Sequence, residues 1–393
     1  MYVFLIYLLL TVYMFLIRNR VSRKYKKTEF FICLFLFFFF VIRYNIGRDL
    51  LSYNVSFYVF KEFPEKLLAI IPHRNGLYHL FLYICIHLFN DYRWVMFLIN
   101  IFTLTICSIT IYKNSKDLIL STLIFIGSGV LEVYYASGVR QMMAMSIFFF
   151  AFYQFLPKKK YGLYELFILI ACLFHETVII AAIIPLLTKG ITLFHKYPVK
   201  MTTISSCIAI SSSIVLSLLL PRLLTIEGVP WEYYTVIGYF SHFSPSILGI
   251  GMETTILIGV LFIYLQTERR DDDFLTLQYM TILLSVLVYY LFIGFSNVSR
   301  VSDSIQIILI VFLPNLISCI KNRTKQIISQ ITIIMFNAFL LFADMKTNLP
   351  AAGRELYRDL SILNDPYVTV FNTSWIDKSF EQREWYPYHR HLQ

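Results

Sequence analysis

Charged residues are scarce in this sequence, because Asp, Glu, Lys and Arg together make up only 15% of its 393 residues. An average soluble domain carries about 25% charged residues, so an ordinary water-exposed surface is excluded. The six cysteines all fall within apolar segments and form no C-x-x-C pair, which excludes a disulfide framework and a cysteine metal site. Nucleotide-binding and lipase-type glycine motifs are also missing, so nucleotide-driven and serine-hydrolase mechanisms have no support.

Hydrophobic residues, in contrast, make up 58% of the chain and gather in long runs. A membrane-spanning helix needs about 20 mainly apolar residues. About twelve segments qualify as transmembrane or re-entrant helices, at 2–17, 28–47, 77–90, 94–112, 118–134, 141–156, 162–187, 201–220, 250–266, 274–295, 303–319 and 327–343. We expect an all-α polytopic membrane protein with a single transmembrane domain at 1–343, amphipathic outer loops at 48–76 and 221–249, and an extracytoplasmic tail at 344–393.

The net charge of +10 follows a membrane pattern and not a nucleic-acid-binding one. Loop 18–27 carries six basic residues and no acidic residue, and 188–200 and 321–325 are basic as well. Such loops normally stay in the cytoplasm, which places the N-terminus outside. The first apolar segment meets a basic loop and no small-residue cleavage site, so we interpret it as a retained helix.

One conflict concerns the loop at 158–160, which contains three lysines. Strict alternation of the segments places this loop outside and Arg140 inside, against the positive-inside rule. The lysine loop and Arg140 both agree with the positive-inside rule if segment 77–90 does not cross the membrane and 162–187 forms a re-entrant hairpin. This alternative, which we prefer, puts Arg140 and His175 on the outer side together with Arg43 and Arg300.

The first candidate site is the stretch R-Y-N-I-G-R-D at 43–49, which follows an unbroken apolar run. Ionisable groups beside a bilayer are costly and mark functional sites. The arginine side chain binds phosphate through two parallel donors and keeps its charge, so Arg43 and Arg48 are candidate diphosphate ligands. Asp49 is a candidate to orient an arginine or to accept a proton from a sugar hydroxyl. Snorkelling of Arg43 and a structural Arg–Asp pair are the alternatives.

The second candidate site surrounds Arg140 and Gln141, which follow the small residues at 136–138 and begin a new apolar segment. A helix N-terminus carries partial positive charge and free N–H groups that suit an anion. We therefore assign both residues to diphosphate binding, with Glu132 as a reserve catalytic group. A helix-end arginine among lipid headgroups is the alternative.

The third candidate is His175, which precedes Glu176 in the middle of an apolar run. An imidazole there suits a general base or a phosphate hydrogen bond, although a packed histidine that bonds another helix is the alternative. The fourth is Arg300, in a polar break between two apolar helices. Trp231, Tyr233 and Tyr234 suit stacking against sugar rings, or an aromatic belt at the membrane interface.

Several of these motifs together resemble the EpsG-like family, which is related in role to O-antigen polymerases of the Wzy type. The resemblance rests on R-Y-N-I-G-R-D, on Y-A-S-G-V-R-Q-M-M-A at 135–144, on the basic 158–160, on A-C-L-F-H-E-T at 171–177 and on Asn297 to Arg300. It covers roughly residues 30–320. Family members usually carry a small hydroxylated residue where Arg48 stands, so Arg48 departs from the pattern.

The resemblance implies a membrane glycosyltransferase with a fold like that of the GT-C enzymes. Its substrates would be polyprenyl-diphosphate-linked oligosaccharide repeat units, joined on the periplasmic or outer face of the bacterial inner membrane with release of undecaprenyl diphosphate. No metal and no cofactor is expected, since arginines would neutralise the diphosphate. Membrane lipid and a chain-length regulator protein are the expected partners, and nucleic acid is not. A lipid-linked glycan ligase and a polyprenyl-linked glycan transporter or flippase remain the alternatives.

Overall fold

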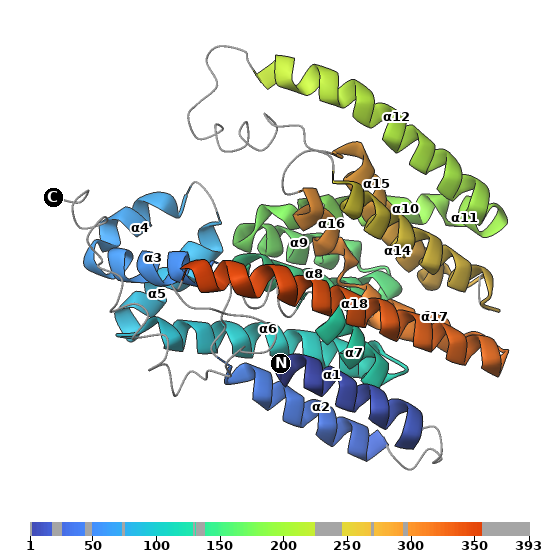
Figure 1. Cartoon of the computed structure of the whole chain (residues 1–393). Coiled ribbons are helices and arrows are strands. Elements are labelled where there is room, and N and C mark those ends of the chain that lie inside the picture. Colours follow the sequence, from blue (N-terminus) through green and yellow to red (C-terminus); the bar gives the residue numbers. More distant parts are fainter. Residues whose placement is uncertain are drawn as a thin grey trace. The chain divides into compact units, whose positions relative to one another are not determined.

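The described part of the chain is built from helices (Figure 1). The computed structural model describes residues 2–17, 26–43, 49–72, 75–128, 130, 138–224, 246–268, 271–293 and 298–355. All the regular elements in these ranges are helical, which confirms the all-α prediction for this part of the chain. The chain divides into two compact units, one formed by 1–150, 169–176 and 327–393, the other by 151–168 and 177–326.

The first unit contains the N-terminal helices. They are α1 (Tyr2–Val12) with its π-helical continuation η1 (Tyr13–Ile17), α2 (Lys26–Val41), α3 (Leu50–Glu62), α4 (Pro64–Ile70), α5 (Gly76–Leu88), α6 (Tyr92–Asn114) and α7 (Leu118–Gly127). Most of α18 (Arg323–Glu355) also belongs to it, together with the start of α8 (Val139–Phe155) and the end of α9 (Tyr161–Phe174).

The second unit contains the rest of α8 and α9 and most of the C-terminal half. Its other helices are η5 (Leu156–Lys158), η6 (Glu176–Ile183), α10 (Ile184–Leu187), η7 (Thr188–Gly190), α11 (Ile191–Lys196), α12 (Pro198–Leu224), α14 (Ile247–Leu265), α15 (Asp273–Leu291), α16 (Val298–Gln306) and α17 (Leu309–Ser318). Residue Glu176, the first of η6, belongs to the first unit.

Fewer helices are long enough to span a membrane than the twelve segments expected. Among the described residues seven helices or continuous helical stretches are long and apolar enough, or eight if α16 and α17, bent by 46° at their junction, count as one span. Segment 28–47 is shorter than predicted because α2 ends at Val41, before the buried Arg43. Segment 118–134 is shorter because α7 ends at Gly127, where the small residues Gly127 and Ser128 begin a break.

Short polar side chains set several helix starts. The carboxylates of Asp91, Asp117 and Asp272 accept hydrogen bonds from the first free backbone N–H groups of α6, α7 and α15, and the Ser246 hydroxyl does the same for α14. These residues satisfy donors that a helix cannot pair internally. They therefore fix where the apolar segments begin.

In the first unit, α2 packs against both α6 and α7. The rings of Phe30 and Tyr112 meet at 5.5 Å near the start of α2 and the end of α6. At the other end Asn100 Nδ2 donates to the carbonyls of Val41 (3.1 Å) and Arg43 (2.8 Å). The two helices therefore run antiparallel, and the loop after α6 lies at the end of the unit where α2 begins.

In the second unit, three contacts gather the loops at one end. Glu268, after α14, pairs with Lys321 at 3.3 Å. His195, at the end of α11, bonds the Thr276 hydroxyl at 2.8 Å. Near the end of α8, Phe152 packs on Phe274 with ring centroids 5.7 Å apart. The lysine loop at 158–160 therefore lies at the same end as the basic loops at 188–200 and 321–325, as the charge pattern predicted.

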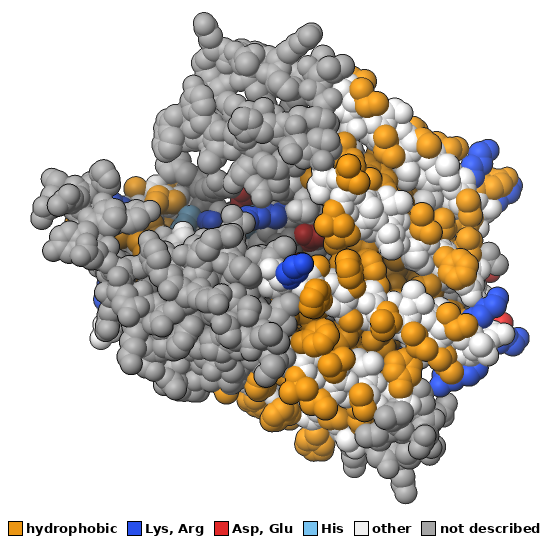
Figure 2. Space-filling model, viewed as in Figure 1, with side chains coloured by type: hydrophobic (Ala, Val, Ile, Leu, Met, Phe, Trp, Pro, Cys, Tyr) orange, Lys and Arg blue, Asp and Glu red, His pale blue; other side chains and the backbone are white. Residues whose placement is uncertain are grey.

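Between these basic loops, residues 161–196 form a helical hairpin. Tyr164 Oη, in the first leg, donates to the carbonyl of Ala181 in the second leg at 2.8 Å. The turn falls at His175, between α9 and η6. A hairpin with its turn at His175 therefore lies within the predicted segment 162–187. Its re-entrant character stays a prediction, because the second leg, Glu176–Lys196, is long and apolar enough to span a membrane by itself. Figure 2 shows hydrophobic side chains over much of the described surface on one face, with several Lys and Arg side chains at its right-hand edge.

Of the two expected outer loops, the structure describes most of 48–76 but only the two ends of 221–249. The expected amphipathic loop 48–76 contains α3 and α4, which pack on each other and on α5. Helix α5 has 13 residues and extends about 20 Å, less than the ~30 Å apolar core of a bilayer. Residues 225–245 and 356–393 lie outside the described residues. Helix α18 continues to Glu355, so no helix end marks the domain boundary expected at 343.

Candidate functional site

Arg140 is the centre of a cluster in the first unit. Two tyrosine rings face its guanidinium, those of Tyr53 on α3 and Tyr78 on α5, each with its centroid 5.6 Å from Arg140 Cζ. Arg140 Nε also donates to Tyr53 Oη at 3.4 Å. The two rings pack edge to face, 6.3 Å apart. Aromatic faces attract a cation, so helices α3 and α5 hold the arginine at the start of α8 in a defined orientation.

Asn75 joins this arginine to Glu176. In the amide orientation that satisfies its neighbours, Asn75 Oδ1 accepts from Arg140 Nη1 at 3.2 Å. Asn75 Nδ2 donates to Glu176 Oε2 at 2.8 Å and to the Phe174 carbonyl at 3.3 Å. One amide therefore couples a cation at the start of α8 to a carboxylate at the hairpin apex. We call Tyr53, Asn75, Tyr78, Arg140 and Glu176 the arginine cluster.

The backbone of Asn75 explains why an asparagine suits this position. It precedes α5 in the left-handed conformation, with φ 50° and ψ 43°. Few side chains other than glycine adopt this conformation, and asparagine tolerates it because its short polar group bonds locally. Glycine would also fit the backbone, but glycine has no amide to connect Arg140 with Glu176.

Asp49 lies one helical turn from the arginine cluster. It is half-buried at the start of α3, and its carbonyl accepts the backbone N–H of Tyr53 at 3.1 Å. Its carboxylate makes no capping bond to the helix. The structure therefore places Asp49 one turn of α3 before Tyr53, the residue whose ring and hydroxyl contact Arg140.

Arg43 is buried, with 1% of its surface exposed. This burial excludes the snorkelling alternative, which requires a guanidinium that faces headgroups or water. Its carbonyl accepts from Asn100 on α6, so the chain that leaves α2 is fixed to a neighbouring helix. A buried cation of this kind is costly and therefore marks a functional or structural polar site.

Gln141 and His175 are also placed in the first unit. Gln141 follows Arg140 on α8 and is buried, with 2% exposed. His175 is half-buried at the end of α9, where its backbone N–H donates to the Ala171 carbonyl at 3.0 Å. The next residue, Glu176, is the one that contacts Asn75.

Arg300 belongs to the second unit, on α16. Its carbonyl accepts from Ser304 Oγ at 2.7 Å, and Ser304 Oγ lies 3.0 Å from Thr177 Oγ1. The turn of α16 that carries Arg300 is thus fixed next to the start of the second hairpin leg. Five other predicted site residues lie outside the described residues: Arg48, Glu132, Trp231, Tyr233 and Tyr234.

A buried carboxylate on α14 was not among the predicted site residues. Glu253 is 5% exposed, and it accepts hydrogen bonds from Ser302 Oγ (3.0 Å) and from Gln306 Nε2 (2.6 Å) on α16. Gln306 Nε2 also donates to Ser302 Oγ at 2.9 Å. The network holds α16, the helix of Arg300, against α14. Glu253 was missed because a single acid within an apolar segment forms no motif.

Asn75 and the two tyrosines that face Arg140 were also not predicted as site residues. Asn75 stands in an unremarked turn, and its contacts come from residues far away in the chain. Tyr53 follows the R-Y-N-I-G-R-D stretch and belongs to the pattern that resembles the EpsG-like family, but it was given no role, and Tyr78 carries no chemical signal among 28 tyrosines. Within the described part of the chain, no group of three or more His, Cys, Asp or Glu side chains is arranged to hold a metal ion.

The apolar spanning helices and the buried polar residues between them define a multi-pass membrane protein. The chain matches the EpsG family model over residues 26–353, most of its length, and it therefore belongs to the EpsG family. The family assignment made from the motifs is thus confirmed, and it points to a polysaccharide polymerase type of membrane glycosyltransferase. No curated protein and no solved structure matches the chain.

Proposed function

We propose that this protein is a polysaccharide polymerase that joins oligosaccharide repeat units carried on a polyprenyl diphosphate. A sugar hydroxyl of one unit attacks the anomeric carbon of the lipid-linked chain. The bond from that carbon to the diphosphate breaks, and undecaprenyl diphosphate leaves with the bonding electrons. The hydroxyl proton passes to a base or to solvent.

The observation that carries this proposal is the state of Arg140. Its Nε and Nη1 groups are held by Tyr53 and Asn75, while Nη2 has no hydrogen-bond partner among the described residues. A preoriented arginine with donors to spare suits an anionic leaving group, whose charge grows in the transition state. Family membership supports the same function.

The other predicted residues have roles around Arg140. Gln141 and Arg43 further stabilise the diphosphate. The buried charge of Arg43 acts strongly because its surroundings have a low dielectric constant. Asp49 and His175 are the candidate bases, with Glu132 in reserve. Glu176 orients the arginine cluster through Asn75, which leaves it a supporting role.

The finer parts of the proposal concern the rest of the chain. Arg300 and Arg48 supply additional positive charge, and Trp231, Tyr233 and Tyr234 bind sugar rings. The fold is of the GT-C type, the reaction needs no metal because arginines balance the diphosphate charge, and a chain-length regulator protein is a partner. The basic loops lie in the cytoplasm, so the hairpin apex faces the periplasm or exterior of a bacterial inner membrane.

The test is polymer formation by purified protein from a lipid-linked repeat as both donor and acceptor. We expect Arg140→Ala to lower the rate roughly a hundredfold or more, as removal of a preorganised donor does. Arg140→Lys keeps the charge but loses the planar fork, and we expect an intermediate rate. Arg323→Ala, which removes an exposed arginine bonded to Gln326, is the matched control and should keep the wild-type rate.

Two results would contradict the proposal. One is a wild-type rate for both Arg140→Ala and Arg43→Ala in folded protein. The other is transfer of glycan only to an added acceptor, with no chain growth from the repeat alone, which would identify a ligase.

A further inference from the structure

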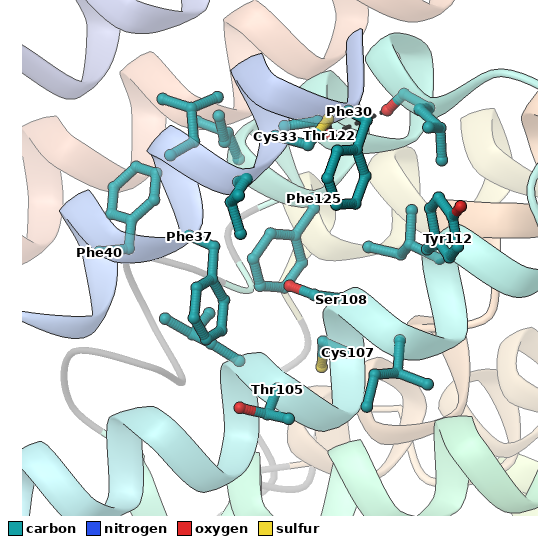
Figure 3. A pocket seen from close by; sticks show the side chains of 17 residues that line it. Phe30, Cys33, Phe37, Phe40, Thr105, Cys107, Ser108, Tyr112, Thr122 and Phe125 are labelled. Carbon is teal, nitrogen blue, oxygen red and sulfur yellow. Dashed lines mark hydrogen bonds between the residues drawn. The ribbon is translucent and has the colours of Figure 1, made fainter. Parts of the chain in front are cut away.

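An apolar groove in the first unit lies between α2, α6 and α7 (Figure 3). Its volume is about 220 Å³. Figure 3 shows the rings of Phe37, Phe125 and Tyr112 around this space, together with the small side chains of Thr105 and Ser108 on α6. None of the residues that line the groove belongs to the arginine cluster. Neither the sequence motifs nor the family assignment gives the groove a ligand.

The groove has a closed floor and an open side. Its floor residues Leu36, Leu104 and Cys107 are at most 6% exposed. Its rim residues Phe30 and Tyr112 are 39% and 59% exposed. In a membrane protein such an opening faces lipid, so an apolar chain can enter sideways from the bilayer.

One end of the groove lies one helical turn from Arg43, whose side chain is buried. Phe40 lines the groove, and its carbonyl accepts the backbone N–H of Arg43 at 3.2 Å, one helical turn further on. On α6, Leu104 lines the groove one turn after Asn100, which bonds the Arg43 carbonyl. An apolar channel that ends at a fixed positive charge is complementary to a molecule with an apolar tail and an anionic head.

We infer that this groove binds the isoprenoid tail of the polyprenyl diphosphate, with the diphosphate at the Arg43 end. The inference rests on the proposed function for the identity of the head group. Five of the 17 lining residues are aromatic, and their rings offer flat apolar surfaces for dispersion contacts with isoprene units. The tail then places the diphosphate at the same helix end for each round of transfer.

The direct test measures binding of radiolabelled undecaprenyl diphosphate and dimethylallyl diphosphate to the purified full-length protein in lipid nanodiscs. The wild type should bind the long-tailed probe at least about tenfold more tightly, because a single isoprene unit is too small to fill the groove. Ser108→Phe fills the groove and should abolish this difference. Ile101→Phe places the same ring at an exposed position of α6 outside the groove, and should retain the difference.

Three outcomes would overturn the inference. These are an unchanged preference for the long tail in Ser108→Phe, equal competition by phosphatidylglycerol, and loss of the preference in Ile101→Phe. Thermal unfolding checks that each variant is folded, and Thr105→Leu provides a milder filling of the same groove if Ser108→Phe is unstable.

The binding test and the polymerisation test fail separately. Tail-dependent binding that depends on the groove, in a protein that forms no polymer, would contradict the proposed function and support the groove. Normal polymer formation from undecaprenyl-linked repeats by Ser108→Phe would support the proposed function and contradict the role of the groove as the tail-binding site.

Discussion

Arg140 and Glu176 are joined by a single side-chain amide, that of Asn75. The cation lies at the start of α8, the carboxylate lies at the apex of the hairpin, and the two hydrogen bonds measure 3.2 Å and 2.8 Å. Opposite charges so arranged orient each other without a direct ion pair. The amide thereby leaves part of the guanidinium for a ligand, which a direct bidentate pair with Glu176 would have occupied.

Substitution of Asn75 separates its backbone role from its amide role. Asn75→Gly keeps the left-handed conformation and should leave the melting temperature nearly unchanged, but it should lower the polymerisation rate roughly tenfold to a hundredfold because Arg140 loses its orientation. Asn75→Ala should in addition lower the unfolding free energy by about 1–2 kcal/mol, since alanine is strained at this φ. Asn90→Gly, at a surface turn that bonds Lys61, is the control. Equal rates for Asn75→Gly and wild type would refute the role of the amide.

The tyrosine that faces Arg140 should act mainly through its ring. Tyr53→Phe removes a long hydrogen bond of 3.4 Å and should reduce the rate by no more than a few fold. Tyr53→Ala removes the ring at 5.6 Å and should cost roughly 1–2 kcal/mol of transition-state stabilisation, about tenfold in kcat/KM. Steady-state rates with the lipid-linked repeat measure both variants. If Tyr53→Phe loses as much as Tyr53→Ala, the hydroxyl and not the ring is the important group.

The placement of the lysine loop predicts which residues share one side of the membrane. In a cysteine-free background, Lys159→Cys and Lys321→Cys should react with an impermeant maleimide from the same side, and Glu176→Cys from the other side. Sealed vesicles of known orientation give the measurement. Labelling of Lys159→Cys and Lys321→Cys from opposite sides would restore the strict alternation of segments and contradict the hairpin topology.

The hydrogen bonds of Glu253 should stabilise the contact between α14 and α16. Glu253→Ala removes the acceptor of the Ser302 hydroxyl and one of the two acceptors of the Gln306 amide, and should lower the unfolding free energy by about 1–3 kcal/mol. The exchange variant Glu253→Gln with Gln306→Glu places amide and carboxylate in swapped positions and should recover most of this loss. Thermal unfolding of the two single variants and the double variant forms a double-mutant cycle. Purely additive effects would show that the two side chains are not coupled.

The sequence predicted the helical class, the basic loops and a hairpin within 162–187, because these depend on local composition and on the charge of the loops, but it did not predict that the turn falls at His175. Helices shorter than expected, such as α2 and α7, end at positions where Arg43 and Gly127 interrupt an apolar run. Hydrophobicity averaged over a window does not detect such single-residue breaks. Among the described residues seven or eight helical stretches reach spanning length and five further apolar helices are shorter, so the predicted count of about twelve transmembrane or re-entrant helices stays a prediction.

The candidate site was only partly predictable. Arg140 and Asp49 stand out in the sequence because ionisable groups next to apolar runs are costly. Asn75 and Tyr78 do not, because their importance comes from contacts with residues far away in the chain. Glu253 escaped notice for a related reason, since only the fold shows that a helix 49 residues further on supplies both of its donors.

The hairpin at 161–196 also has a consequence for biogenesis. Its apex carries a charged residue, Glu176, which must cross the hydrocarbon core to reach the outer side, and a charge at the centre of that core costs roughly 2.5–3.5 kcal/mol. The first leg has only 14 residues in α9, too few to span the bilayer alone. We therefore expect the translocation machinery to retain the first leg until the second leg has left the ribosome. The two legs would then enter the bilayer as one folded pair.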